Sequence, residues 1–291
     1  MTAGGPRGQR ERGIALVAVL WALALLAAVL IGFSGTTRTE TVLTRNLLEQ
    51  ARARHLADGA IQLAILRLLD PRAESKVRID GAPFAVNADG IEIAVSILDE
   101  GGKIDLNVAS PDLLAGLFAS AGVPPREARL LARNVVDWRD EAIMPGAQQV
   151  YAALGEPFAP RNRPFDALAE LHHIFGMTPA LARRITPYLT LFNQREGIDP
   201  AVAPAAVLAA LPGFDPRQVD IFLRTRPPAY FREDSPELDL GVARSFVQPS
   251  SGTAFTIAAE VAMAGGATYR REAVVLLTGR PSEPFLIAAV R

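Results

Sequence analysis

The chain has 291 residues, of which 49% are hydrophobic, and its formal net charge at pH 7 is −1. A chain of this length can bury one large core or two modest ones, and its near-neutral charge gives no general attraction to nucleic acid. The absence of cysteine excludes disulfides and thiolate metal sites, and three histidines leave little for a histidine-based metal centre.

An uncharged apolar run, residues 14–33, follows a short arginine-rich leader. A helix of about 20 apolar residues is long enough to cross the hydrocarbon core of a bilayer. The run is longer than the apolar part of a secretory signal peptide, and a poor cleavage site follows it. We therefore expect a retained membrane anchor whose basic flank stays in the cytoplasm. A cleaved signal peptide is the alternative.

Helical periodicity continues beyond the apolar run. No proline interrupts residues 36–69, apolar side chains recur at intervals of three or four residues, and Pro71 ends the pattern. The sequence therefore predicts one helix over about residues 14–70. Its first half is suited to lipid, and its second half is amphipathic and packs on a domain.

A short basic leader that ends in glycine, followed by such a helix, resembles the N-terminus of type IV pilins and pseudopilins. The resemblance implies that a prepilin peptidase cuts between Gly13 and Ile14, methylates Ile14, and leaves the apolar segment as the anchor. Most members have a glutamate as the fifth residue of the mature chain, where this sequence has Ala18. The missing carboxylate is typical of the K-type minor pseudopilin of type II secretion.

Alternating segments rich in β-branched residues flank a middle region of helical character, from about residue 110 to residue 242. The sequence therefore predicts an α+β fold, in which the pilin-like N-terminal helix packs on an antiparallel sheet and a large all-helical domain is inserted between strands. Strands are predicted at residues 77–86, 91–98, 254–262, 268–277 and 284–290. The predicted divisions are a leader at 1–13, the helix at 14–70, the first part of the pilin-like domain at 71–106, the inserted helical domain at 107–245 and the completing strands at 246–291.

The helical region repeats one short pattern three times, beginning at Leu117, Leu171 and Leu208. In each copy a glycine, a hydrophobic residue and a proline follow the leucine at the same distances. A glycine at this place can end a helix in the left-handed conformation, and a proline suits the first turn of the next helix. Thr178 and Asp215 are the predicted N-caps. The pattern therefore predicts three helical hairpins.

Helical hairpins also occur in DNA-binding proteins, where a Gly-hydrophobic-Gly turn offers backbone N–H groups to a phosphate. The second glycine is missing from all three copies, and Asp215 would place a carboxylate near the phosphate. Compact packing units are the favoured interpretation, and no nucleic-acid partner is expected. The alternative function is a membrane-anchored nucleic-acid-binding protein, which a contiguous basic stripe across the Gly122, Gly176 and Gly213 turns would favour.

Four longer blocks extend the resemblance to the K-type minor pseudopilin over nearly the whole chain. They are "LDEGGKIDLNVAS" (98–110), "VVDWRDEAIMPGAQQVYAAL" (135–154), "NRPFDALAELHHIFGMTPALARRITPYLT" (162–190) and "DPAVAPAAVLAALPG" (199–213). The resemblance implies a single-pass inner-membrane protein with a cytoplasmic N-terminus and a periplasmic C-terminal domain. It also implies a place at the tip of the pseudopilus, in a complex with the I-type and J-type minor pseudopilins that initiates assembly and supports protein export. Secreted substrates and the secretin are further contacts that this place would allow.

Asp137, Asp140 and Glu141 supply hard oxygen ligands at the end of a predicted helix, which suits Ca²⁺. Family members can bind Ca²⁺ in this domain, often with acidic residues where this chain has Gln148 and Gln149. Solvated surface carboxylates are the alternative. No HExxH, G-x-S-x-G, P-loop or EF-hand pattern is present, so no catalytic residue is predicted and the chain is not expected to be an enzyme. A membrane-anchored periplasmic enzyme without a recognisable motif is the remaining alternative.

Overall fold

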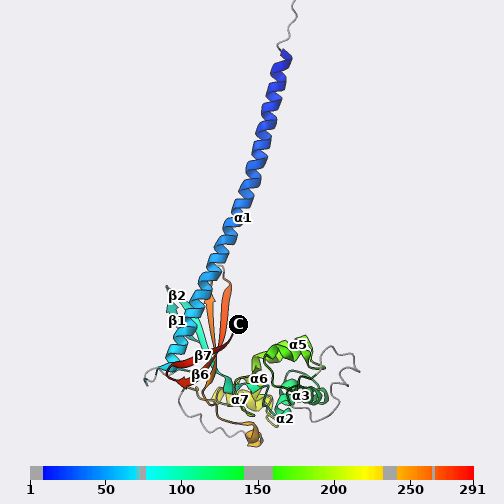
Figure 1. The fold of residues 1–291 in the computed structure, drawn as a ribbon, viewed down its shortest axis with the longest axis vertical. Helices are drawn as coiled ribbons and strands as arrows, with labels where there is room; N and C mark the ends of the chain where they lie inside the picture. Colours follow the sequence, from blue (N-terminus) through cyan, green and yellow to red (C-terminus); the bar gives the residue numbers. More distant parts are fainter. Residues whose placement is uncertain (1–8, 71, 73–76, 141–159, 232–240, 264–265) are drawn as a thin grey trace, which may run out of the picture.

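The structure, a computed structural model, describes residues 9–70, 72, 77–140, 160–231, 241–263 and 266–291. Side chains are described for these residues except 9–14, 30–39, 216 and 241–243. Figure 1 shows one long helix whose lower end lies on a sheet, with a region of short helices at the end of the molecule remote from the N-terminus.

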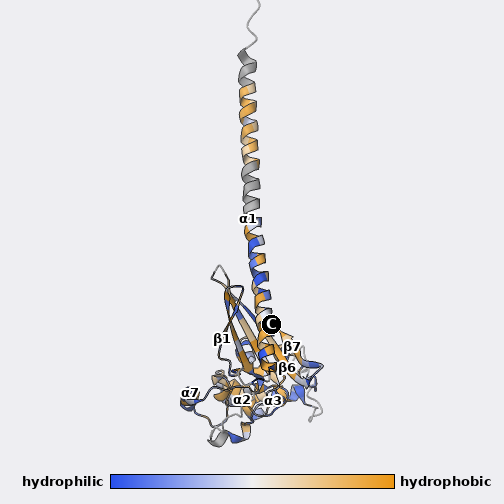
Figure 2. Cartoon of the chain, turned by 90° about the vertical axis from the view of Figure 1, so that its left-hand side faces the viewer, coloured by the Kyte–Doolittle hydropathy of each residue, from blue (hydrophilic) through white to orange (hydrophobic). Residues whose placement is uncertain are grey.

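The long helix is α1, Gln9–Leu69, which has 61 residues and confirms the prediction of one helix through this region. Its length is about 90 Å at about 1.5 Å per residue. The part of α1 far from the sheet is hydrophobic, and the part near the sheet mixes hydrophilic and hydrophobic residues (Figure 2). Large apolar side chains are exposed in the first part, including Leu16, Trp21 and Leu25. Ile14 and residues 30–33 of the predicted span lie outside the described side chains.

Among the described residues, no helix contains an apolar stretch long enough to cross a membrane.

The second half of α1 buries a face made mainly of small residues. Ala53, Ala57 and Ala64 are at most 3% exposed, and Ile65 and Leu68 are fully buried. With Ala60, which is also 3% exposed, the buried positions 53, 57, 60, 64 and 68 recur every three or four residues and form one stripe along the helix. The alanines let α1 lie close to the strands, and the larger residues fill the core near its C-terminus.

The sheet has five antiparallel strands in the order β1-β2-β5-β6-β7, which confirms the predicted antiparallel sheet. β2 ends at Asp99 and β5 begins at Ala254, so the chain between them leaves the sheet and returns to the neighbouring position. The strands are β1 (Phe84–Ala88), β2 (Ile91–Asp99), β5 (Ala254–Ala262), β6 (Thr268–Arg280) and β7 (Glu283–Val290).

The first predicted strand, residues 77–86, is only partly correct. β1 begins at Phe84, and the preceding residues form isolated bridges instead, Arg78 with Tyr230 and Asp80 with Leu98. Gly81 separates the two parts at φ +82°, a conformation that breaks a regular strand. The alternating pattern therefore identified extended backbone but could not show that its partner changes at this glycine.

The chain between β2 and β5 forms short elements around a core of its own. Residues from Ile104 to Val219 make one buried apolar cluster, and α1 with the strands makes most of a second. The helices are α2 (Pro111–Ser120), α3 (Pro125–Arg139), α5 (Pro179–Ile185), α6 (Ala205–Leu208) and α7 (Pro216–Thr225), and the 3-10 segments are η1 (Glu100–Gly102), η2 (Leu168–His173), η3 (Thr186–Tyr188) and η4 (Gly241–Phe246).

A two-stranded parallel sheet inside this region was not predicted. It consists of β3, Ile104–Asp105, and β4, Leu189–Thr190. Two residues per strand are too few to give an alternating pattern, so periodicity could not detect them. The exact domain boundaries stay predictions.

Candidate functional site

The three repeated glycines adopt the conformation that the sequence predicts. Gly122, Gly176 and Gly213 have φ values of +91°, +80° and +81°. Thr178 and Asp215 cap the following helices, because the side-chain oxygen of each accepts a backbone N–H. Two of the three copies join α-helices, whereas the first helix of the second copy is the 3-10 segment η2. The predicted hairpins are thus confirmed, with this one difference.

The first two hairpins contact one another through Arg184, an arginine of the kind that could otherwise bind a phosphate. Arg184 Nη1 donates to Ala121 O at 2.5 Å, next to the first glycine turn. The Cβ of any residue replacing Gly176 would lie 3.2 Å from Leu131 Cδ2, so the second turn also packs closely on α3. These contacts support the interpretation of the hairpins as packing units.

Three sequence blocks that carry the family resemblance meet at Trp138. Its indole is 1% exposed and stacks on Phe165, with 6.3 Å between the ring centroids. Asn107, from the first block, holds Phe165 in place: Asn107 Nδ2 donates to Phe165 O at 3.1 Å, and Phe165 N donates to Asn107 Oδ1 at 2.7 Å. Residues far apart in the chain therefore form one packed unit.

Glu170 completes this unit as a buried acceptor. Its Oε2 accepts from Arg161 Nη1 at 2.6 Å and from Trp138 Nε1 at 3.4 Å, and its Oε1 accepts from the backbone N–H groups of Asp166 and Ala167. Burial alone would raise the pKa of the Glu170 carboxyl, but the hydrogen bonds from Arg161 and Asp166 outweigh burial and lower it. Glu170 is therefore ionised and fully bonded at neutral pH.

Arg139, the neighbour of Trp138, ties the end of α3 to the first block. Its guanidinium is 7% exposed and donates to two backbone carbonyls, Leu106 O at 2.7 Å and Ala109 O at 2.8 Å. Arg139 Nε donates to Asp140 Oδ1 at 3.0 Å, so Asp140 neutralises the buried charge. One oxygen of a predicted Ca²⁺ ligand is thus engaged with an arginine.

The predicted Ca²⁺ ligands lie at the C-terminal end of α3. Burial raises the pKa of the Asp137 carboxyl, and the neighbouring Asp140 charge raises it further. Glu141 lies outside the described residues. Ca²⁺ takes six to eight oxygen ligands, and in the described part of the chain no group of three or more acidic, histidine or cysteine residues could hold a metal. Asp137 and Asp140 could supply only part of a site, and Ca²⁺ stays a prediction.

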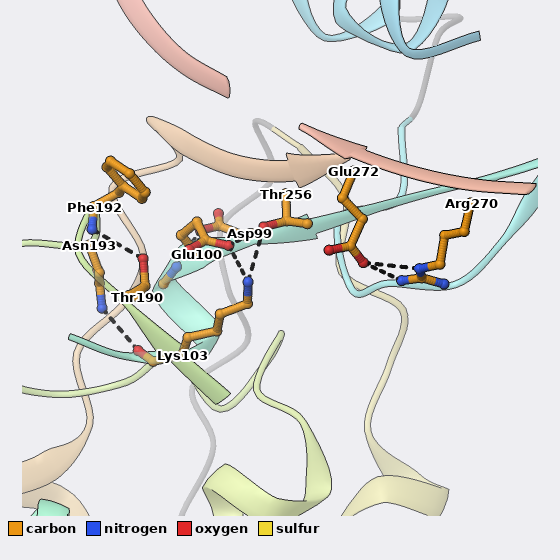
Figure 3. A network of polar contacts seen from close by, with 10 residues as sticks. Asp99, Glu100, Lys103, Thr190, Phe192, Asn193, Thr256, Arg270 and Glu272 are labelled. Carbon is orange, nitrogen blue, oxygen red and sulfur yellow. Dashed lines mark hydrogen bonds and ion pairs between the residues drawn. The ribbon is translucent and has the colours of Figure 1, made fainter. Parts of the chain in front are cut away.

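A second polar unit lies where β2 enters η1 (Figure 3). Glu100 and Lys103 form an ion pair there, with side chains 2% and 11% exposed. Lys103 Nζ donates to Glu100 Oε1 at 2.5 Å and to Thr256 Oγ1 at 3.0 Å, and the Thr256 hydroxyl also donates to Glu100 Oε1. The pair therefore fixes the helical region to β5. A buried pair of this kind is costly to break, because removal of one partner leaves the other charged, buried and unpaired.

Asp99 joins the outgoing and returning chains. Its Oδ1 accepts from Ser250 Oγ at 2.6 Å and from Gly101 N at 2.7 Å. Asp199 approaches from the middle of the helical region: its backbone N donates to Gly101 O, and its Oδ2 accepts from Ser250 N. Three separate stretches of chain are thus held together at the base of the sheet.

The surroundings of Asp99 disfavour the charged form of its carboxyl group. Its Oδ2 is buried and has no hydrogen-bond partner within the described chain. Burial raises the pKa of the Asp99 carboxyl to about 6, and the charges of Asp199 and Glu100 act in the same direction.

The close approach of the three stretches of chain around Asp99 explains the Gly-Gly pair of the first block. A Cβ on Gly101 would lie 2.4 Å from Ser250 Oγ, and a Cβ on Gly102 would lie 2.7 Å from Val202 O. Only glycine allows the three stretches to approach so closely. The sequence identified the block but assigned no role to Asp99, Lys103 or Asp199; a Gly-Gly pair directly after acidic residues at a strand end is the signal that could have found the junction.

The predicted processing site lies at the start of α1. Gly13 and Ile14 lie in the part of α1 for which side chains are not described, so cleavage and methylation there stay predictions. Ala18 is exposed, as are its described neighbours on this part of the helix.

Comparison with known proteins points to one secretion component. Residues 95–194 match the family model "Type II secretion system (T2SS), protein K". Proteins with the name type II secretion system protein K are similar over 62% of this chain: those of Klebsiella pneumoniae (28% identity), Dickeya chrysanthemi (25%) and Pectobacterium carotovorum subsp. carotovorum (27%). The chain spans 62%, 66% and 62% of the length of these relatives.

The fold is also that of a solved structure. The chain matches a chain of the GspK-GspI-GspJ complex from enterotoxigenic Escherichia coli with a TM-score of 0.60 and 20% identity, over 85% of this chain and 98% of the other. The family model covers the end of β2 and the helical region as far as residue 194, which includes the Trp138 unit and Asp99 but not Asp199 or Ser250 of the junction. The family model, the named relatives and the sequence blocks agree in showing similarity to type II secretion system protein K.

Proposed function

We propose that the chain is a minor pseudopilin at the tip of the type II secretion pseudopilus, where it initiates assembly and supports protein export across the outer membrane. The observation that carries the proposal is the combination of a pilin-like α1 and sheet with a helical region similar to that of protein K. The proposed partners are I-type and J-type minor pseudopilins, as in the complex that gives the matching fold. The proposed role is structural and not enzymatic.

The location at the tip is supported by the shape of the molecule. The helical region lies at the end remote from the N-terminus of α1 (Figure 1). In a filament whose helices run parallel, a subunit stacked above would meet this region. A chain with a bulky region there is suited to the last position and not to the shaft.

Ala18 supports the same location. In pilins the glutamate at this position is thought to pair with the N-terminal amine of the next subunit toward the tip, and an unpaired carboxylate in lipid is costly. A subunit with no neighbour above gains nothing from that acid. Ala18→Glu is therefore expected to leave assembly unchanged or to reduce it.

The first part of α1 is proposed as the inner-membrane anchor, with the N-terminus in the cytoplasm and the rest of the chain in the periplasm. Its apolar side chains are exposed on all sides of the helix and therefore need an apolar environment. A prepilin peptidase would cut after Gly13 and methylate Ile14. Mass spectrometry of the mature N-terminus, with and without that peptidase, tests this step, and a mature start near Gly35 would overturn it.

Co-purification tests the partner proposal. The full chain, expressed with the I-type and J-type minor pseudopilins of the same system, should leave a size-exclusion column in one complex with both. A chain that lacks residues 107–245 is the informative variant: it should still bind the other two if the pilin-like part supplies the contacts. Separate elution of the intact chain would contradict the proposal.

Two further proposals are subordinate. Ca²⁺ would bind at Asp137 and Asp140, together with Glu141, and would then raise the melting temperature of the intact chain but not of an Asp137→Asn variant. The nucleic-acid alternative is not favoured, because the named relatives are secretion proteins and Arg184 is engaged with Ala121 O.

A further inference from the structure

Arg195 is a half-buried arginine whose guanidinium is not bonded to the protein. Arg139, Arg226 and Arg271 are also buried or half-buried, and each of them donates to a carbonyl or carboxylate oxygen. The side chain of Arg195 donates no hydrogen bond to any described residue and forms no ion pair with one. A guanidinium has five N–H donors, and a partly buried polar group without partners is costly. Arg195 therefore lacks the partner that the other three arginines have.

The turn that carries Arg195 is held in place by buried groups. Gln194 has a φ of +54°, which is uncommon for a residue other than glycine. Its backbone N–H donates to Asp105 Oδ2 at 2.7 Å, and Asp105 is 1% exposed. Such a conformation persists only where the surrounding structure imposes it. The backbone before Arg195 is thus fixed, although the guanidinium has no partner.

Arg195 lines a hollow of about 520 Å³ beside the sheet. The floor of the hollow is apolar, because Leu276 of β6 and Leu286 of β7 lie opposite one another in the strand register. Phe192, which is half-buried, also lines it. Small-molecule sites commonly have volumes of about 300–1,000 Å³, with mostly apolar walls and a few polar groups. The hollow therefore has the size and the lining of a ligand site.

The charge of this hollow is positive. Arg195 is the one charged residue among the described residues that line it. The next residue, Glu196, is exposed and forms no ion pair with Arg195. Figure 3 shows Phe192, at the border of the hollow, on the opposite side of the polar network from the ion pair of Arg270 and Glu272. A ligand with one negative charge would complement the hollow.

A hydroxyl group supplies a further donor. Ser251 Oγ and Thr253 Oγ1, which line the hollow, are 2.8 Å apart. Each hydroxyl has one proton and their contact uses one, so the other is free to donate. The parallel N–H groups of a guanidinium match the two oxygens of a carboxylate. The hollow thus offers hydrogen-bond donors for a carboxylate beside an apolar floor.

We propose that the hollow binds the C-terminus of a partner protein, with the free carboxylate at Arg195 and an apolar last side chain on Leu276 and Leu286. In a C-terminal residue the carboxylate and the side chain are attached to the same carbon atom, so both fit into one hollow. An aspartate or glutamate within a chain carries its carboxylate in place of an apolar side chain. Capture of a terminal carboxylate is a known mode of peptide recognition. The inference does not rest on the function proposed above.

The test uses the full chain in a non-ionic detergent and the peptide Ala-Ala-Leu with a fluorescent label at its N-terminus. Fluorescence anisotropy measures its affinity. The same peptide with a C-terminal amide is the matched control, and it should bind about tenfold more weakly or worse, because it lacks the charge. Labelled Ala-Ala-Ser, with a free carboxylate and a polar last residue, tests the apolar floor and should also bind more weakly. Labelled Leu-Glu-Leu amide tests an internal acidic side chain and should bind no better than the amide control.

Two arginine variants locate the site. Arg195→Gln should weaken binding of the free-carboxylate peptide about tenfold or more and leave binding of the amide peptide unchanged. Arg183→Gln is the control, because Arg183 is exposed on α5 and does not line the hollow; it should keep the affinity of the parent chain. Because Arg195 is not bonded to a described residue, Arg195→Gln should not lower the melting temperature of the free chain. Circular dichroism shows whether both variants fold.

Four outcomes would overturn the proposal. The first is no binding of the free-carboxylate peptide at millimolar concentration, which would mean that water alone solvates Arg195. The second is equal affinity for the acid and amide peptides. The third is unchanged affinity in the folded Arg195→Gln variant, or an equal loss in Arg183→Gln. The fourth is tighter binding of the Leu-Glu-Leu amide than of the Ala-Ala-Leu acid, which would assign the hollow to an acidic side chain instead of a chain end.

Discussion

The two regions of the molecule are held together by different means. The α1 and sheet region buries small and β-branched apolar residues along regular elements, as Ala57 and Ile65 of α1 show. The helical region consists of short helices and turns, and it buries polar groups such as Arg139 and Glu170 among its apolar residues. Short helices have little stability of their own, so tertiary contacts and hydrogen bonds must fix them.

This difference predicts different weak points. A regular sheet and a long helix share their stability over many similar contacts. In the helical region, a few side chains each connect several segments that would not otherwise hold their positions. We therefore expect single substitutions to have larger and more local effects in the helical region.

The largest effect is expected at Trp138. Trp138→Ala removes the ring that stacks on Phe165 and leaves a cavity, which for such a substitution typically costs about 3–5 kcal/mol of unfolding free energy. Thermal unfolding followed by far-ultraviolet circular dichroism should show an early, partial loss of helical signal from this region, while the strand signal persists. Leu130→Ala on the same helix is the control, because Leu130 is 53% exposed. A single cooperative transition at a lowered temperature would refute the separate character of the two regions.

The next effect concerns the junction between the regions. The pKa of Asp99 is raised from 3.8 to about 6, chiefly by burial. The folded chain therefore binds a proton more tightly than the unfolded chain, and its stability falls as the pH rises from about 4 to 6. At about 1.36 kcal/mol per pKa unit, the loss is about 3 kcal/mol at pH 7.5.

Asp99→Asn should remove this dependence, because the amide keeps an oxygen for Ser250 and Gly101 and carries no charge. Urea denaturation at pH 4.5 and pH 7.5 measures the slope for both proteins. The variant should be the more stable of the two at pH 7.5. A slope equal to that of the parent chain would show that Asp99 is not the group responsible.

Sequence reasoning succeeded where structure is periodic. The long helix and four of the five strands follow from repeats of 3.6 and two residues, and the hairpin turns follow from glycines that need positive φ. It failed where position depends on distant partners. Arg139 binds the carbonyls of Leu106 and Ala109, and no local pattern could show that these groups would lie beside α3.

The same limit applies to the candidate site. The blocks around Asp99 and Trp138 were recognised by resemblance, but their roles depend on Ser250 and Phe165, which lie far along the chain. The place of β7 in the sheet was also beyond local inference. Its sequence predicts a strand in any position, and only the strand order shows that β7 is the last of the described strands.

A pair of glycine substitutions compares the regions directly. Gly176→Ala places a side chain at φ +80° and within 3.2 Å of Leu131 Cδ2, so it should destabilise the chain by about 1–2 kcal/mol. Gly59→Ala lies in α1, where a Cβ would meet nothing within 4 Å, and it should stabilise the helix by up to about 1 kcal/mol. Denaturant midpoints of the two variants should move in opposite directions, and a shift in the same direction would contradict the structure at one of these glycines.

The smallest effect is expected at a surface contact that ties α1 to the sheet. Arg271 Nε donates to Asp58 Oδ1 at 2.7 Å, with side chains 21% and 41% exposed. Water screens such a pair, and exposed pairs contribute about 0.2–1 kcal/mol. Arg271→Ala and Asp58→Ala should each lower stability by no more than this, and the double variant should lose little beyond either single one. The coupling energy from this double-mutant cycle should fall further in 1 M salt. A coupling of several kcal/mol would mean that α1 is held to the sheet by specific polar contacts as the helical region is, and that the contrast between the two regions is smaller than their cores indicate.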